Sequence, residues 1–284
     1  MFKKEISINT LQAKIKAITF GEPKSEPILC FHGWQDNAAS FIPLAQKLEQ
    51  YYVIAVDLPG HGKSSHISEG SFYHFIDGVA IIYSIIKHLK LDKPKVIAHS
   101  MGAAMTLLTA GTFPKLFDKI VVIENLGPFS RVADENPQYT KTAIESLLKI
   151  SKQKRQPSFP ILEDLIKLRF RVGDVSLAGA KLLMVRGSYK KNNRIYLRRD
   201  PRLKIPSALR MNEKQVYSYL RKIESNVLLI EAKDGLDYDQ ELIKKRIEKF
   251  KNIQVKKLEG KHHLHMDEPL SVAKEITDFF KRDK

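Results

Sequence analysis

The chain has 284 residues, 43% of them hydrophobic, and it carries a formal net charge of +16. This hydrophobic content is sufficient for a buried core, which excludes a disordered chain, and no apolar run approaches the ~20 residues that a membrane span needs. The length fits one large α/β domain with an insertion, or two modest domains.

Cys30 is the single cysteine of the chain, so no internal disulfide can form. The charged residues 1–6 are not followed by the apolar stretch of a signal peptide. Both observations favour a cytoplasmic location.

From residue 6 to residue 123, the sequence pattern alternates between strands and helices. Loose alternation and short apolar runs predict a pair of strands over 6–20 and single strands over 28–31, 53–56, 96–98 and 120–123. Helical spacing of apolar residues predicts helices over 38–50, 72–91 and 101–112. Such an order indicates an α/β fold with a mostly parallel central sheet flanked by helices.

The alternation stops at residue 128, and residues 128–225 show helical patterns and loops but no clear strand of the same kind. A strand over 227–230 resumes the sheet, followed by a helix over 241–250, a strand over 253–258 and a helix over 270–280. We therefore predict a core made of residues 1–127 and 226–284, with a mostly helical cap, residues 128–225, inserted between two strands.

The predicted cap carries most of the excess positive charge. It contains 22 Lys and Arg against nine Asp and Glu, a balance of +13. A well-solvated basic surface explains this, and we favour it; the alternative is attraction of an anionic substrate or partner. No nucleic-acid-binding motif with aromatic platforms accompanies the charge, so nucleic acid is not an expected partner.

Ser100 stands where a predicted strand turns sharply into a helix, in the stretch VIAHSMG of residues 96–102. This is the sequence form of a nucleophile elbow, with Ala98 in place of the usual first glycine. The turn crowds the residues two before and two after the serine, so Ala98 and Gly102 meet the demand for small side chains. The helix that follows directs its free N–H groups and positive dipole end at the serine.

The element order and three further motifs resemble the α/β-hydrolase superfamily, most closely its serine-hydrolase-like, or kraken-type, branch. The motifs are HGWQDN at residues 32–37, DLPGHGKSS at 57–65 and HHLHMDEP at 262–269. The resemblance covers nearly the whole chain except the middle of the cap. It specifies the fold much more sharply than the substrate, because this fold hosts many chemistries.

A serine hydroxyl needs a base, and the family's order of Ser, acid and His requires a histidine near the C-terminus. His262, His263 and His265 are available, and the family pattern selects His262, with Lys261 where a glycine is common. We expect structural roles for the other two. Three close histidines also suit a metal ion, but no paired cysteines or second ligand cluster accompany them, so neither a metal nor a cofactor is expected.

Two residues compete for the acid that orients His262. Asp234 follows the strand after the cap, one residue short of the usual spacing, whereas Glu124 ends the strand before the cap, where the resembled branch usually has an acid. We favour Glu124, for which a salt bridge to a cap arginine is the alternative explanation. For the oxyanion hole, the resemblance implies the backbone N–H groups of Met101 and Trp34.

These residues imply a serine hydrolase that cleaves a carboxylic ester or thioester through an acyl-enzyme on Ser100. A serine nucleophile argues against dehalogenase and epoxide-hydrolase chemistry, which on this fold typically uses aspartate. Two alternatives stay open: a carbon–carbon bond hydrolase with the same triad, and a catalytically silent binding or scaffold protein. The acyl group, the leaving group and the oligomeric state are not readable from the sequence.

Overall fold

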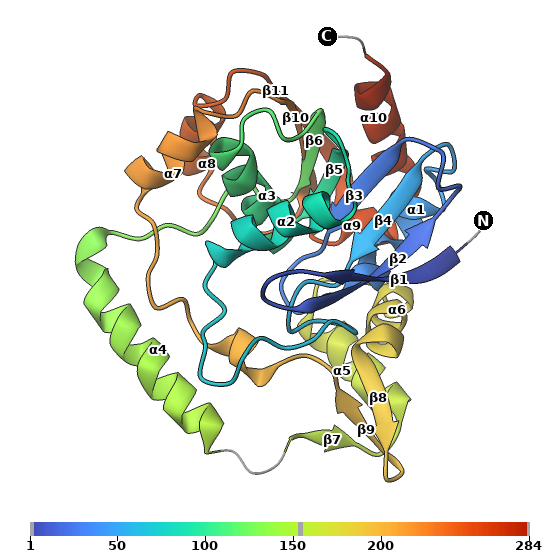
Figure 1. The fold of residues 1–284 in the computed structure, drawn as a ribbon, viewed down its shortest axis with the longest axis vertical. Helices are drawn as coiled ribbons and strands as arrows, with labels where there is room; N and C mark the ends of the chain where they lie inside the picture. The colour runs from blue at the N-terminus through green and yellow to red at the C-terminus, as the bar shows by residue number, and fades with distance from the viewer. Residues whose placement is uncertain (1–2, 153–155, 283–284) are drawn as a thin grey trace.

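An eight-stranded sheet runs through the molecule in the order β1-β2-β4-β3-β5-β6-β10-β11, as a computed structural model shows for residues 3–152 and 156–282 (Figure 1). The first two strands pair antiparallel to their neighbours, and the remaining six are parallel. The strands are β1 (Lys3–Asn9), β2 (Lys14–Phe20), β3 (Pro27–Phe31), β4 (Tyr52–Val56), β5 (Lys95–His99), β6 (Lys119–Ile123), β10 (Asn226–Asp234) and β11 (Ile253–Lys261). The predicted mostly parallel sheet is confirmed.

Helices cover both faces of this sheet because its inner strands are apolar on both sides. Along β5, Val96 and Ala98 face one helix layer and Ile97 faces the other, since successive side chains point to opposite faces. The first layer contains α2 (Asp77–His88), α3 (Met101–Thr112), α7 (Glu213–Leu220) and α8 (Gln240–Ile247). The second contains η1 (Ala38–Phe41), α1 (Ile42–Ala45), α9 (Leu264–Asp267) and α10 (Pro269–Lys281).

Two predicted helices are shorter than their sequence pattern. The one expected over 72–91 begins at Asp77, because the preceding segment is held elsewhere: the Tyr73 hydroxyl donates to Asp200 at 2.9 Å. The one expected over 38–50 divides into η1 and α1, which together end at Ala45. Tertiary contacts therefore override the local apolar spacing at both places.

The segment between β6 and β10 contains helices and a second, three-stranded antiparallel sheet in the order β7-β9-β8. Its elements are η2 (Ala133–Glu135), α4 (Asn136–Ser151), β7 (Ser158–Phe159), α5 (Leu162–Val172), α6 (Leu177–Gly187), β8 (Ser188–Lys191), β9 (Arg194–Leu197) and η3 (Pro201–Lys204), before α7. The small sheet is not apparent from the sequence, because its strands are only two to four residues long. The last helix, α7, packs against α3, and the backbone of Tyr219 approaches Gly111 so closely that no side chain fits there.

A buried ion pair joins this segment to the main sheet. Arg186 on α6 donates from Nε to both carboxylate oxygens of Asp57, at 2.9 and 3.0 Å, and Asp57 is fully buried after β4. Asn37 adds a hydrogen bond from its side chain to Leu183 O on the same helix. The residues after β3 and β4, where functional groups of parallel sheets gather, thus contact α6 directly.

Among residues 3–152 and 156–282, no helix has the length and apolar character needed to cross a bilayer. Residues 1–2, at the start of the N-terminal stretch considered above, and residues 153–155, inside the predicted cap, lie outside the described residues.

Candidate active site

Ser100 occupies a strained turn between β5 and α3. Its backbone has φ 49° and ψ −114°, which lies in a region that non-glycine residues seldom adopt. A Cβ on Gly102 would lie 2.3 Å from Phe31 O, so the backbone at the end of β3 is what demands a glycine here. We expected Gly102 to be crowded by Ala98, but the backbone of the neighbouring strand β3 crowds it more closely.

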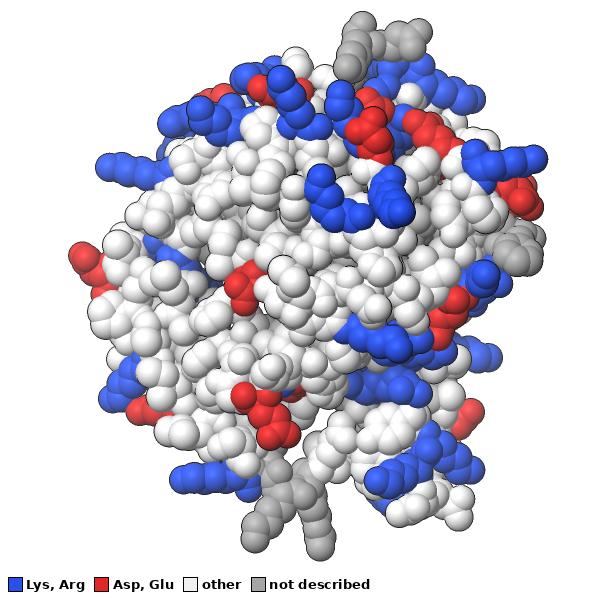
Figure 2. All heavy atoms as spheres, in the orientation of Figure 1, with Lys and Arg blue, Asp and Glu red and all other residues white. Residues whose placement is uncertain are grey.

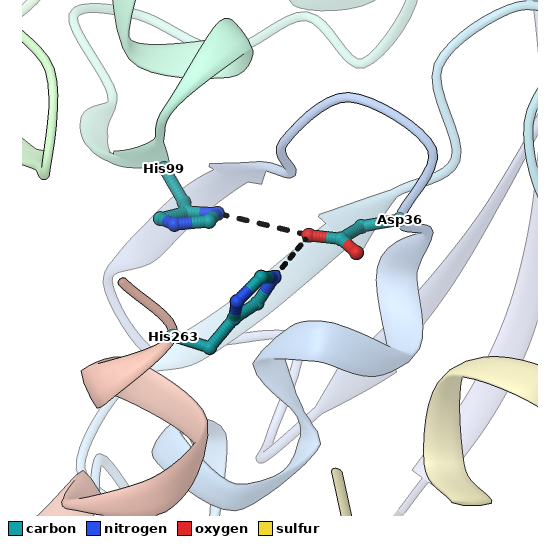
Figure 3. Close-up of side chains that lie close together, drawn as sticks. All are labelled: Asp36, His99 and His263. Atoms are coloured by element: carbon teal, nitrogen blue, oxygen red, sulfur yellow. Dashed lines mark hydrogen bonds and ion pairs between the residues drawn. The ribbon is translucent and has the colours of Figure 1, made fainter. Parts of the chain in front are cut away.

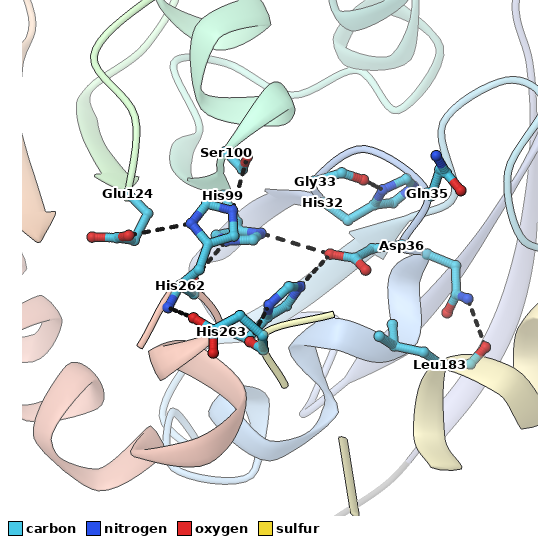
Figure 4. Close-up of polar contacts among 12 residues, drawn as sticks. His32, Gly33, Gln35, Asp36, His99, Ser100, Glu124, Leu183, His262 and His263 are labelled. Atoms are coloured by element: carbon cyan, nitrogen blue, oxygen red, sulfur yellow. Dashed lines mark hydrogen bonds and ion pairs between the residues drawn. The ribbon is translucent and has the colours of Figure 1, made fainter. Parts of the chain in front are cut away.

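His262 and Glu124 lie in line with Ser100 (Figure 4). The serine Oγ is 3.2 Å from His262 Nε2, and His262 Nδ1 is 3.2 Å from Glu124 Oε2. The three side chains come from the start of α3, the end of β11 and the end of β6, which meet at one edge of the sheet. This hydrogen-bond order assigns the His262 proton to Nδ1 and leaves Nε2 free to accept the serine proton.

The Glu124 carboxylate is held by two backbone donors as well as by His262. Oε1 accepts from Ala232 N at 2.6 Å, and Oε2 accepts from Leu236 N at 3.3 Å. A Cβ on Gly235 would lie only 2.1 Å from Oε2, so the glycine leaves the space that the carboxylate fills. Sequence reasoning missed Gly235; its place just after the strand that neighbours β6 is the only signal it offers.

The structure does not bring Asp234, the rival acid, to the histidine. Asp234 is exposed at the end of β10, where it pairs in register with Lys261 of β11. The family pattern expects a glycine at position 261, where this chain has Lys261. The preceding residue, Gly260, adopts the positive φ of +124°. The turn into His262 therefore keeps a residue that tolerates this conformation.

The two backbone N–H groups expected to form the oxyanion hole belong to Met101 and Trp34. Met101 opens α3, and Trp34 follows β3; neither N–H has an acceptor among the residues that the structure describes. The Trp34 side chain is about half exposed and donates from Nε1 to Leu203 O in η3 at 2.8 Å. The indole thus contacts the inserted segment, and the adjacent main chain is left free for a ligand.

Buried histidines hold the loop around Trp34. His32 accepts from Leu58 N at 3.0 Å, and His61 accepts from Gln35 N at 3.2 Å, so both rings are neutral acceptors. Burial lowers the pKa of His32 to about 4 and that of His61 to about 3, which agrees with these roles. The strained φ of 62° at Gln35 is stabilised by the second of these bonds.

Asp36 is the centre of a buried charged network that sequence reasoning did not find. It accepts from His263 Nε2 at 3.0 Å and from Arg169 on α5 at 2.9 Å, and it lies 3.8 Å from His99 Nδ1 (Figure 3). Burial opposes ionisation, but His263 and Arg169 hold the pKa of Asp36 well below its usual value. Burial also opposes a charge on His263, yet Asp36 raises its pKa.

The same three residues, Asp36, His99 and His263, have the composition of a metal site, with their donor atoms within 4.8 Å of one another. Arg169 already binds the carboxylate, and its positive charge opposes a second cation there. His99 Nε2 instead donates to His262 O at 2.9 Å, and burial with the nearby His265 holds the pKa of His99 well below its usual value. We interpret the group as an ion-pair network that supports His262.

A pocket opens between α5, α6 and the loop after Trp34. It encloses about 480 Å³, counting its open mouth, and residues 35–37 are part of its lining. Its walls carry apolar side chains from α5, α6 and β9 together with Arg169 and Arg199. Such a concave, mainly apolar site with a few polar groups suits a small molecule.

Comparisons with known proteins identify relatives of this chain and its fold. A family model described as "alpha/beta hydrolase fold" matches residues 26–171. A "probable serine hydrolase" from Drosophila melanogaster is 31% identical, with 98% of this chain and 87% of the relative covered. The crystal structure of a hypothetical protein from Pseudomonas aeruginosa PAO1 is 32% identical, with a TM-score of 0.92 over 98% of this chain and 99% of that one. A thioesterase domain from the curacin biosynthetic pathway, 22% identical, has a TM-score of 0.86 over 98% and 100% of the two chains and shows the same fold.

Proposed function

Because the chain belongs to the α/β-hydrolase family, in its serine-hydrolase-like branch, we propose that Ser100, His262 and Glu124 form a catalytic triad that hydrolyses a carboxylic ester or thioester. The observation that carries this proposal is the continuous hydrogen-bonded line from Ser100 Oγ through His262 to Glu124, with 3.2 Å at each step. Nucleophile, base and orienting acid in this order are what acyl transfer requires.

In the first half of the reaction, Ser100 Oγ attacks the carbonyl carbon while its proton passes to His262 Nε2. The developing oxyanion is bound by the N–H groups of Trp34 and Met101. Collapse of the tetrahedral intermediate breaks the bond to the alcohol or thiol, which leaves with the proton from His262. Glu124 stabilises the imidazolium and keeps the ring in the required orientation.

In the second half, His262 takes a proton from water, whose oxygen attacks the acyl group on Ser100. The carboxylic acid leaves, and the proton returns to the serine. Within the segment 128–225, α4–α6 and the small sheet act as the cap over this site. The last helix of the segment, α7, packs on the core instead. The contact of the segment with Trp34 through η3 supports the role of the cap.

Labelling with a fluorophosphonate and hydrolysis of a nitrophenyl ester test the nucleophile. Ser100→Ala is expected to abolish both while leaving the thermal unfolding profile intact, because no other described serine lies beside His262. Undiminished labelling of the variant would show that Ser100 is not the nucleophile. A wild-type protein that takes no label would instead favour the silent scaffold.

The acid is tested by a matched pair of variants. Glu124→Gln is expected to lower kcat by orders of magnitude, about 10⁴-fold in the best-studied triad, because the histidine loses its orienting charge. Asp234→Asn changes an exposed carboxylate and is expected to leave kcat within about twofold of wild type. The reverse ranking, with both proteins folded, contradicts the assignment of Glu124.

A further inference from the structure

The pocket between α5, α6 and residues 35–37, called the cap pocket below, is lined by the residues that follow the proposed oxyanion-hole residue Trp34 in the chain. Gln35 and Asp36 come directly after Trp34 and form part of the pocket lining. Leu165 and Leu168 line it from α5, and Arg169 and Arg199 bring two guanidinium groups to it. The cap pocket is therefore a site, lined by the residues that follow Trp34, that is largely apolar and carries positive charge.

The charges of the cap pocket do not cancel. Asp36 is its one acidic residue, and this carboxylate already binds both Arg169 and His263. Arg199, by contrast, makes no hydrogen bond or ion pair with any residue in 3–152 or 156–282. Burial and the nearby Arg169 lower the pKa of Arg199, but an arginine stays charged at neutral pH. One positive charge in the pocket is thus left without an anion.

Arg199 differs in this respect from its basic neighbours. Arg198 donates from Nε to Ser188 O at 3.0 Å and lies over the Tyr189 ring, and Arg202 binds Asp200. Figure 2 shows many Lys and Arg side chains around the outline of this face and some nearer its centre, on the surface where solvent screens them. The general basic surface therefore does not account for Arg199, which lines a pocket.

We propose that the cap pocket binds a free carboxylate of the substrate through Arg199, assisted by Arg169, so that the preferred substrate is an ester or thioester carrying a carboxylate on a short apolar linker. This proposal rests on the proposed function. A planar guanidinium matches a carboxylate with two parallel hydrogen bonds. The single uncompensated charge suits a monoanion, and Leu165 and Leu168 suit the methylene groups of the linker.

Pairs of charged and neutral esters test the proposal by kcat/KM. Mono-4-nitrophenyl adipate against 4-nitrophenyl hexanoate places the carboxylate on the acyl side. The pair 3-carboxy-4-nitrophenyl acetate and 4-nitrophenyl acetate places it on the leaving group. In at least one pair the wild-type protein is expected to prefer the charged ester, and Arg199→Gln is expected to lower that preference about tenfold or more.

Two variants separate a pocket contact from general charge. Lys191→Gln removes the same charge from an exposed position on β8 and is expected to leave the preference within about twofold. Arg199→Lys keeps the charge but loses the planar fork, so an intermediate preference is expected. No preference in either ester pair, or the same change in Arg199→Gln and Lys191→Gln, overturns the proposal.

A binding measurement keeps this test independent of turnover. Monomethyl adipate is titrated calorimetrically into Ser100→Ala protein, and adding Arg199→Gln is expected to weaken its binding at least tenfold, whereas adding Lys191→Gln is not. If binding depends on Arg199 but the wild-type protein takes no fluorophosphonate label, the proposed hydrolysis is refuted and the carboxylate site is retained. Labelling of Ser100 without Arg199-dependent binding refutes the carboxylate site alone.

Discussion

Gly235→Ala tests whether the space beside Glu124 is what allows the triad to assemble. The added methyl carbon would lie 2.1 Å from Glu124 Oε2, whereas ordinary van der Waals contact begins near 3.4 Å. The carboxylate or the loop must therefore retreat by the difference, about 1.3 Å. A misplacement of about 1 Å can lower a rate by ~10²-fold, so we expect kcat to fall by about that factor.

The assay is the initial rate of nitrophenyl-ester hydrolysis at saturating substrate, with circular dichroism to confirm folding. Asp234→Ala is the matched control, because it changes the adjacent residue of the same strand end to alanine without crowding the carboxylate. We expect a large fall in kcat for Gly235→Ala and a small one for Asp234→Ala. Adding Gly235→Ala to Glu124→Gln is expected to cause little further loss beyond that of Glu124→Gln alone, because both changes act on the same carboxylate. Wild-type turnover in Gly235→Ala would refute the argument, since the carboxylate could then not occupy the position described.

Two further predictions concern stability. Arg186→Met is expected to lower the free energy of unfolding by about 3–5 kcal/mol, because it leaves the buried Asp57 carboxylate without its cationic partner. Urea unfolding measures this loss, and Lys181→Met, at an exposed position on the same helix, is the control. An equal loss in both variants contradicts the prediction. The raised pKa of His263 makes its contribution to stability fully present below the unfolded-state pKa of about 6.5 and lost as pH rises through the folded-state pKa. The difference in unfolding free energy between wild type and His263→Gln should therefore shrink from pH 6 to pH 9, and a difference that grows would show that the sign is wrong.

Local patterns were sufficient for the outline of the molecule. The apolar runs and their alternation with helices predicted the parallel sheet, since a strand buried on both faces must be apolar throughout. The elbow was readable for the same reason: a strand, a small residue, a serine and a glycine lie within seven consecutive positions. The strands β7–β9 could not be predicted from the sequence, because strands of two to four residues leave no periodic signal.

Sequence alone determined that Ser100 and a C-terminal histidine were candidates, because each lies in a compact motif. Only the tertiary structure decided that Glu124, and not Asp234, lies beside His262. Both residues come at the ends of neighbouring strands, but Ile123 pairs with Ile230 and β10 continues from there to Asp234, which is exposed. The same holds for Asp36 with Arg169, 133 positions apart in the chain, and for Arg199 in the cap pocket. Charge and burial at such sites depend on which distant segments pack together, and no spacing along the chain encodes that.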